Sequence, residues 1–226
     1  MGNAKQWTND QWADALADEF FSRNYEGEPV TLAVDEVSLA RLTGLSPEDA
    51  KAALAKVVRR LSFWGYYEQC KVWRKGPCDR PPPSLPLLAL NVLAASSMAK
   101  FHFYEPLRAL LEMPGHGIPP GYAETVPAMW NELDWWLDVQ HCGSRGLSTI
   151  ENHEHFSNIG YSLKQALFRA SDRTLLYRFF RAIRLDPLTD EVVPVEIRRA
   201  LAIWSRRQGP AADRLHRLAT DSSIEP

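Results

Sequence analysis

The segment DEVSLARLTGLSPEDAKAALAKVV, residues 35–58, contains the strongest local folding signals of the chain. Asp35 can cap a short helix, and Gly44 can end that helix because glycine adopts a left-handed backbone conformation without a steric penalty. Ser46 and Pro47 are typical of a helix start, so a second, longer helix is predicted to begin there. Two helices joined by a tight turn at a glycine predict a helix-turn-helix.

The segments before and after this motif predict further secondary-structure elements. Apolar residues recur at helical spacing between residues 7 and 21, which predicts an amphipathic helix. Residues 30–34 alternate like a short strand, and the aromatic segment 63–73 can form a strand or a hairpin. Strand, two helices and hairpin in this order resemble a winged helix, so we expect a winged-helix-like domain over residues 1–76.

The composition changes between residues 77 and 86, where prolines stand at 77, 81, 82, 83 and 86. Consecutive prolines favour an extended chain, so we expect a Pro-rich connection and a domain boundary here. A stiff connection inside one domain is the alternative. Residues 87–219 have the periodicity of helices throughout, and residues 220–226 form a tail. The predicted fold class is therefore mainly α, with a winged-helix-like domain followed by an all-α helical domain.

Length and composition exclude several classes of protein. The chain has 226 residues, of which 45% are hydrophobic and 24% are charged, so it is neither disordered nor collagen-like. Three cysteines are too few for a disulfide scaffold. The first twenty residues include Lys5, three aspartates and Glu19 but no apolar run, which argues against a secretory signal. No stretch reaches the ~20 apolar residues of a membrane span, and we expect a cytoplasmic protein.

The net charge of −2 conceals an uneven distribution. Residues 1–160 carry 14 Lys and Arg against 20 Asp and Glu, whereas residues 161–226 carry 12 against 8, and eleven of those twelve are arginine. Arginine presents a planar fork to phosphate and carboxylate groups, so we expect a surface for nucleic acid or an acidic partner. Solvated helix faces, or pairing with the acids of residues 1–160, are the alternatives. The candidate binding residues in this part are Arg169, Arg173, Arg178, Arg181, Arg198, Arg199, Arg206 and Arg207.

The helix-turn-helix provides a second candidate surface. A recognition helix places its N-terminal residues on base edges, and here these residues are Pro47, Glu48 and Asp49. Their carboxylates oppose phosphate contact and suit the helix dipole instead. Basic residues follow later in the helix and on the predicted wing, which favours phosphate contact over base reading. The candidates are Lys56, Arg59, Arg60, Lys71, Arg74 and Lys75.

One polar cluster contains residue types that bind metal ions or act as nucleophiles, namely His141, Cys142, His153 and His155. Their spacing does not match a familiar zinc pattern, so a polar loop is the preferred interpretation and no metal site is predicted. The glycine motifs of nucleotide-binding loops are absent from the sequence. We therefore predict no cofactor, no small-molecule ligand and no membrane partner.

A longer pattern begins with IGYSLKQALFR at residues 159–169 and continues with Asp172-Arg173 and Phe179-Phe180. Upstream, the same pattern includes Trp130, Leu133, Trp136-Leu137, Gly143 and Gly146. It resembles a poorly characterised region of large bacterial proteins, some of which are associated with anti-phage defence neighbourhoods. The resemblance covers residues 84–207. It implies that the chain is part of a longer protein or a subunit of an assembly, and it implies no catalytic residue.

These observations together predict a non-enzymatic scaffold module that binds nucleic acid or a partner protein, as a component of a bacterial anti-phage defence system. Two alternatives stay open. One is an enzyme or metal-dependent activity around the histidine and cysteine cluster at residues 141–155. The other is a winged-helix DNA-binding regulator that uses only the first domain.

Overall fold

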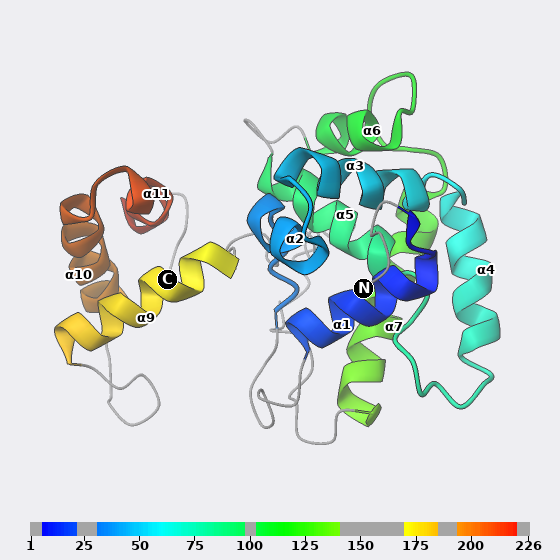
Figure 1. The fold of residues 1–226 in the computed structure, drawn as a ribbon, viewed down its shortest axis with the longest axis horizontal. Helices are drawn as coiled ribbons and strands as arrows, with labels where there is room; N and C mark the ends of the chain where they lie inside the picture. Colours follow the sequence, from blue (N-terminus) through cyan, green and yellow to red (C-terminus); the bar gives the residue numbers. More distant parts are fainter. Residues whose placement is uncertain (1–5, 22–30, 98–102, 141–169, 185–193, 221–226) are drawn as a thin grey trace. The chain divides into compact units, whose positions relative to one another are not determined.

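The chain folds into two compact units, Met1–Arg169 and Ala170–Pro226, and each is described by itself. The computed structural model describes residues 6–21, 31–97, 103–140, 170–184 and 194–220. All regular secondary structure within these ranges is helical, which confirms the mainly α fold class (Figure 1).

The first unit is built around one apolar helix, α5. Every residue from 85 to 95 is buried, and the amide of Asn91 donates to the carbonyl oxygen of Leu87 at 2.8 Å. Helices α1, α3, α6 and α7 all pack against α5. The helices of this unit are α1 (Asn9–Phe20), α2 (Glu36–Thr43), α3 (Pro47–Val58), α4 (Phe63–Trp73), α5 (Leu85–Ser96), α6 (Tyr104–Leu111) and α7 (Tyr122–Gln140).

The helix-turn-helix of residues 35–58 is confirmed by its caps. The Asp35 carboxylate accepts a hydrogen bond from the Ser38 amide at 2.7 Å and begins α2. Gly44 ends α2 with a φ of 68°, and the Ser46 hydroxyl accepts from the Asp49 amide at 3.2 Å to begin α3. The two helices pack against each other. Local sequence signals therefore decide this part of the fold.

The cap at Ser46 can be tested by substitution. Ser46→Ala removes the acceptor of the Asp49 amide, so we expect a loss of about 1 kcal/mol in the free energy of unfolding. Chemical denaturation of the full chain measures this loss. Ser46→Thr keeps a hydroxyl acceptor and serves as the control. An unchanged midpoint for Ser46→Ala would contradict the cap.

The hairpin predicted over residues 63–73 is wrong, because this segment forms helix α4. The Ser62 hydroxyl accepts from the Gly65 amide at 3.0 Å and begins the helix. The buried side chains are Phe63, Tyr66 and Cys70, whose spacing of three and four residues is that of a helix face. The winged-helix interpretation is therefore not confirmed, since the segment expected to form the wing is a helix.

The strand predicted at residues 30–34 is also not found in its described part, residues 31–34. The amides of Ala33 and Val34 donate to the carbonyl oxygens two residues earlier, at 2.9 Å in both cases. Such bonds belong to tight turns. Leu32, Ala33 and Val34 are all buried, so the apolar residues serve packing rather than strand pairing.

The Pro-rich segment 77–86 lies inside the first compact unit rather than at its edge. Asn9 of α1 donates to the Pro83 carbonyl oxygen at 2.8 Å, and the Trp136 indole of α7 donates to that of Cys78 at 3.1 Å. Pro82 is buried. The prolines thus follow a fixed path against helices from both halves of the sequence, as in the alternative of a stiff connection.

The second unit consists of α9 (Ala170–Ile183), α10 (Pro194–Arg207), the 3₁₀ turn η4 (Gly209–Ala212) and α11 (Asp213–Thr220). Phe179 is fully buried, and its ring centroid lies 5.6 Å from that of Trp204 on α10. Helices α10 and α11 pack together, and the His216 Nδ1 atom lies 3.0 Å from the Ala202 carbonyl oxygen. Of the helices in the described ranges, none has the length and apolar character that crossing a membrane requires.

Candidate nucleic-acid interface

The second unit is rich in arginine. Residues 170–226 contain ten arginines, no lysine and eight acidic residues, a formal balance of +2 (10 − 8), and all ten arginines lie within residues 170–184 and 194–220. Seven of the arginines are exposed, and none of these seven forms an ion pair with another described residue. The exposed arginines are Arg178, Arg181, Arg184, Arg199, Arg206, Arg207 and Arg217.

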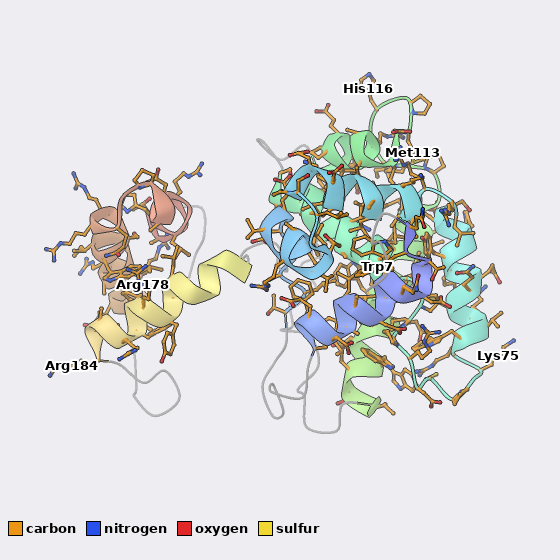
Figure 2. All side chains as sticks on the ribbon, in the orientation of Figure 1. Trp7, Lys75, Met113, His116, Arg178 and Arg184 are labelled. Carbon is orange, nitrogen blue, oxygen red and sulfur yellow. The ribbon has the colours of Figure 1, made fainter. Side chains whose placement is uncertain are left out.

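Helix α9 places an aromatic ring beside these cations. Tyr177 is 64% exposed, and the guanidinium carbon of Arg181 lies 5.8 Å from the centroid of its ring. Arg178 lies on the same helix, and Arg184 follows the end of the helix (Figure 2). An exposed aromatic ring next to guanidinium groups is typical of surfaces on which bases stack while phosphates are neutralised.

Helix α10 combines exposed arginine and apolar residues on one face. Val195, Arg199, Ile203 and Arg206 are spaced by four, four and three residues, and all are exposed. Arg198 differs because it is half-buried and its Nε atom donates to the Ala219 carbonyl oxygen at 3.0 Å. Arg198 therefore holds α10 against α11 and contributes to the packing of the unit.

The structure does not place all of the arginines predicted in this region. Arg169 and the side chain of Arg173 lie outside the described residues. Arg184 and Arg217 are exposed but were not among the predicted binding residues, although the excess of arginine in residues 161–226 was the signal that could have included them.

The six basic residues predicted in the first unit are partly neutralised by neighbours. Arg59 forms an ion pair with Glu112. Lys71 donates to Glu68 at 2.8 Å, and this hydrogen bond raises the pKa of Lys71 above its ordinary value. Both pairs lie within the described residues and reduce the charge available to an external phosphate.

Arg74 is also held internally. Its guanidinium lies over the Trp135 ring, 2.9 Å from the centroid, and its Nε atom lies 3.5 Å from a Glu132 oxygen. The remaining three of the six residues have no ion pair to another described residue, and they are Lys56, Arg60 and Lys75.

The start of α3, the helix expected from the sequence to face DNA, is acidic in the structure, as the sequence indicates. The Lys51 ammonium lies 2.7 Å from a Glu36 oxygen and 3.1 Å from a Glu48 oxygen, so it is shared between two carboxylates. These hydrogen bonds raise the pKa of Lys51. A cation engaged in this way contributes little to phosphate binding, and the described geometry gives no support for base reading by α3.

The four residues considered as metal ligands or nucleophiles lie outside the described residues, and they are His141, Cys142, His153 and His155. Within the described ranges, no group of three or more His, Cys, Asp and Glu side chains has an arrangement that could hold a metal ion. The two other cysteines are buried, and burial raises the pKa of the Cys70 thiol. The Cys78 thiol donates to the Trp73 carbonyl oxygen, with 3.4 Å between sulfur and oxygen. Cys70 and Cys78 both contribute to the packing of the first unit.

The predicted binding residues thus fall into two sets. Those of the second unit include five exposed arginines without an ion pair to another described residue: Arg178, Arg181, Arg199, Arg206 and Arg207. Half of those in the first unit are engaged with carboxylates. The exposed arginines of the second unit are therefore the best candidate interface. No family model, no curated protein and no solved structure matches the chain.

Proposed function

We propose that this chain is a non-enzymatic nucleic-acid-binding module and that the exposed arginines of α9, α10 and α11 bind the phosphate backbone. The observation that carries the proposal is the set of seven exposed arginines without an ion pair to another described residue. Cations concentrated on a small unit repel one another, and phosphates relieve this repulsion while they release their own condensed counterions.

The residue types also favour nucleic acid over an acidic protein. Arginine matches the geometry of phosphate oxygens with two parallel N–H groups, and no lysine occurs among the described residues of this unit. Tyr177 adds a ring that can stack on a base. An acidic protein also offers carboxylates to the arginines, but carboxylates do not stack on an exposed aromatic ring such as that of Tyr177.

The resemblance at residues 159–180 supplies the cellular setting of the proposal. It supports a scaffold component of a bacterial anti-phage defence assembly, in which binding of nucleic acid positions other parts of the assembly. The winged-helix regulator has weaker support, because α4 replaces the expected hairpin and the start of α3 is acidic.

The test is the salt dependence of binding by the full chain. Wild-type protein is titrated against a labelled mixed-sequence DNA duplex and an RNA of the same sequence. The double variant Arg178→Glu, Arg181→Glu removes two phosphate contacts, so we expect roughly 60-fold weaker binding at about 0.1 M salt and a salt slope lower by about 2. The loss should be similar for unrelated sequences, since the contacts go to the backbone.

The matched control is Lys56→Glu, Lys75→Glu, which makes the same change of charge in the first unit and leaves binding much less affected. Absence of binding by wild-type protein at every salt concentration would overturn the proposal. If the Arg178→Glu, Arg181→Glu variant then also unfolds more easily, the arginines pair with acids of residues 1–160 instead.

A further inference from the structure

We propose that a cavity between α3, α4, α5 and α6 in the first unit is a binding site for a small amphipathic anion, a molecule with an apolar body and a carboxylate, sulfonate or phosphate head. The cavity has a volume of about 420 Å³. This volume lies within the range of small-molecule sites, roughly 300–1,000 Å³. The sequence predicted no such ligand, and the site is independent of the arginines of the second unit.

The walls of the cavity are apolar. Leu87 of α5, Val58 of α3, Leu111 of α6 and the aromatic rings of Phe63 and Tyr66 line it, and all five side chains are buried in the fold. None of the described residues that line the cavity is acidic. An apolar molecule placed here is removed from water, which is the main favourable contribution to binding at such sites.

The rim of the cavity carries two arginines in different states. Arg59 is engaged, because it pairs with Glu112 and its Nε atom donates to the Ala55 carbonyl oxygen at 3.2 Å. Arg60 is exposed and forms no ion pair with another described residue. It is the residue that can bind the head of an anion while the apolar body fills the cavity.

The buried phenol of Tyr66 is close enough to Arg60 to respond to its charge. Burial raises the pKa of Tyr66, and the positive charge of Arg60 partly opposes this increase. The Tyr66 hydroxyl donates to Asn9 at 3.0 Å, so the ring is fixed in the wall. Arg60 and Tyr66 both line the cavity, so the cation lies beside its buried aromatic wall.

Another part of the lining comes from a loop that hydrogen bonds hold in place. Arg108 is buried and donates to the carbonyl oxygens of Pro114, Gly117 and Ile118 at 2.6, 2.9 and 3.2 Å. This loop carries Met113, seen in Figure 2, and Pro120 to the cavity. A rim that is already ordered reduces the entropic cost of binding.

Trp64 provides a spectroscopic probe of the cavity. It lines the cavity, is 49% exposed, and lies against Gly121, where an added Cβ would be 2.8 Å from the indole Nε1 atom. Gly121 also has a φ of 78°, which favours glycine. The indole lies beside the cavity, so a ligand that enters the cavity changes the environment of this indole.

Charge complementarity selects the class of ligand. A purely apolar molecule leaves the Arg60 guanidinium without an anion, and a simple anion such as acetate leaves the apolar walls unfilled. Decanoate, with a ten-carbon chain and one carboxylate, is a suitable probe because it combines both features. Decanol has the chain without the charge, and acetate has the charge without the chain.

The experiment titrates the full chain with decanoate, decanol and acetate, by calorimetry and by the NMR signal of the Trp64 indole N–H. Decanoate is expected to bind and to shift the indole signal, and acetate is expected to do neither. Arg60→Gln should weaken decanoate binding at least tenfold and leave the weaker binding of decanol unchanged. Lys75→Gln removes an exposed cation that does not line the cavity, so it should leave both affinities unchanged.

Two results overturn the inference. One is the absence of decanoate binding up to about 1 mM, the weak end of specific binding. The other is decanoate binding that leaves the Trp64 signal unmoved or that survives Arg60→Gln unchanged, because the molecule then binds elsewhere. Arg60 is exposed, so its substitution is expected to leave the fold intact.

Discussion

Leu88→Ala is expected to lower the free energy of unfolding of the entire first unit by about 2–5 kcal/mol. Leu88 is fully buried in α5, and α5 packs against α1 and α3 as well as against α6 and α7. The cavity left by the missing atoms therefore weakens contacts to helices from both sides of the Pro-rich segment 77–86. If the first unit unfolds cooperatively, every helix in it must show the same loss in the free energy of unfolding.

Native-state hydrogen exchange on the full chain distinguishes this outcome from two separate domains. Amides of α3 and of α7 should lose protection by equal amounts in Leu88→Ala. Val37→Ala is the control, because Val37 lies in the same unit but is 61% exposed, and its effect should stay within about 0.5 kcal/mol. If α3 keeps its protection while α7 loses it, residues 1–76 are a separate domain after all.

Where the signal is local, the sequence predicts the fold well. A helix N-cap needs only a side chain and an amide three residues away, so the caps at Asp35 and Ser46 could be predicted from the sequence. The helix end at Gly44 could be predicted in the same way, because glycine adopts a positive φ without a steric penalty. The prediction of a strand or hairpin at residues 63–73 was wrong because aromatic residues favour strands. The buried residues Phe63, Tyr66 and Cys70 nevertheless follow the spacing of a helix. A cap at Ser62 was the missing signal.

Features that depend on distant contacts could not be predicted in this way. The prolines of residues 77–86 resemble a linker until the bonds from Asn9 and Trp136 are known. The sequence shows Arg59 and Arg60 as equivalent neighbours, yet among the residues that the structure describes only Arg59 forms an ion pair, with Glu112. The cavity beside them combines residues more than fifty positions apart, so no motif indicates it.

The apolar residues of the pattern between residues 130 and 180 are divided between the two units. Trp130, Leu133 and Leu137 are buried in the first unit. Phe179 is buried in the second unit, whereas its neighbour Phe180 is only half-buried. Adjacent residues on a helix point about 100° apart, so one of the pair faces the core and the other reaches its edge.

Phe179→Ala is therefore expected to unfold the second unit while the first unit keeps its structure. Phe179 is fully buried, and its ring centroid lies 5.1 Å from that of Phe180 and 5.6 Å from that of Trp204. Removal of a buried phenylalanine ring costs about 3–5 kcal/mol. A unit of roughly 60 residues has little stability to spare, because it buries a smaller share of its surface than a larger domain.

Hydrogen exchange again provides the measurement, with α10 amides reporting on the second unit and α5 amides on the first. Phe179→Ala should abolish protection in α10 and leave α5 unchanged. Tyr177→Ala is the matched control, since Tyr177 lies on the same helix but is 64% exposed and its removal leaves α10 protected. The same Phe179→Ala protein should also lose affinity for nucleic acid, because the arginines of α9 and α10 then lie on separate mobile segments rather than on one packed unit. Retained protection in α10 would show that Leu215 and its neighbours hold the unit together without Phe179.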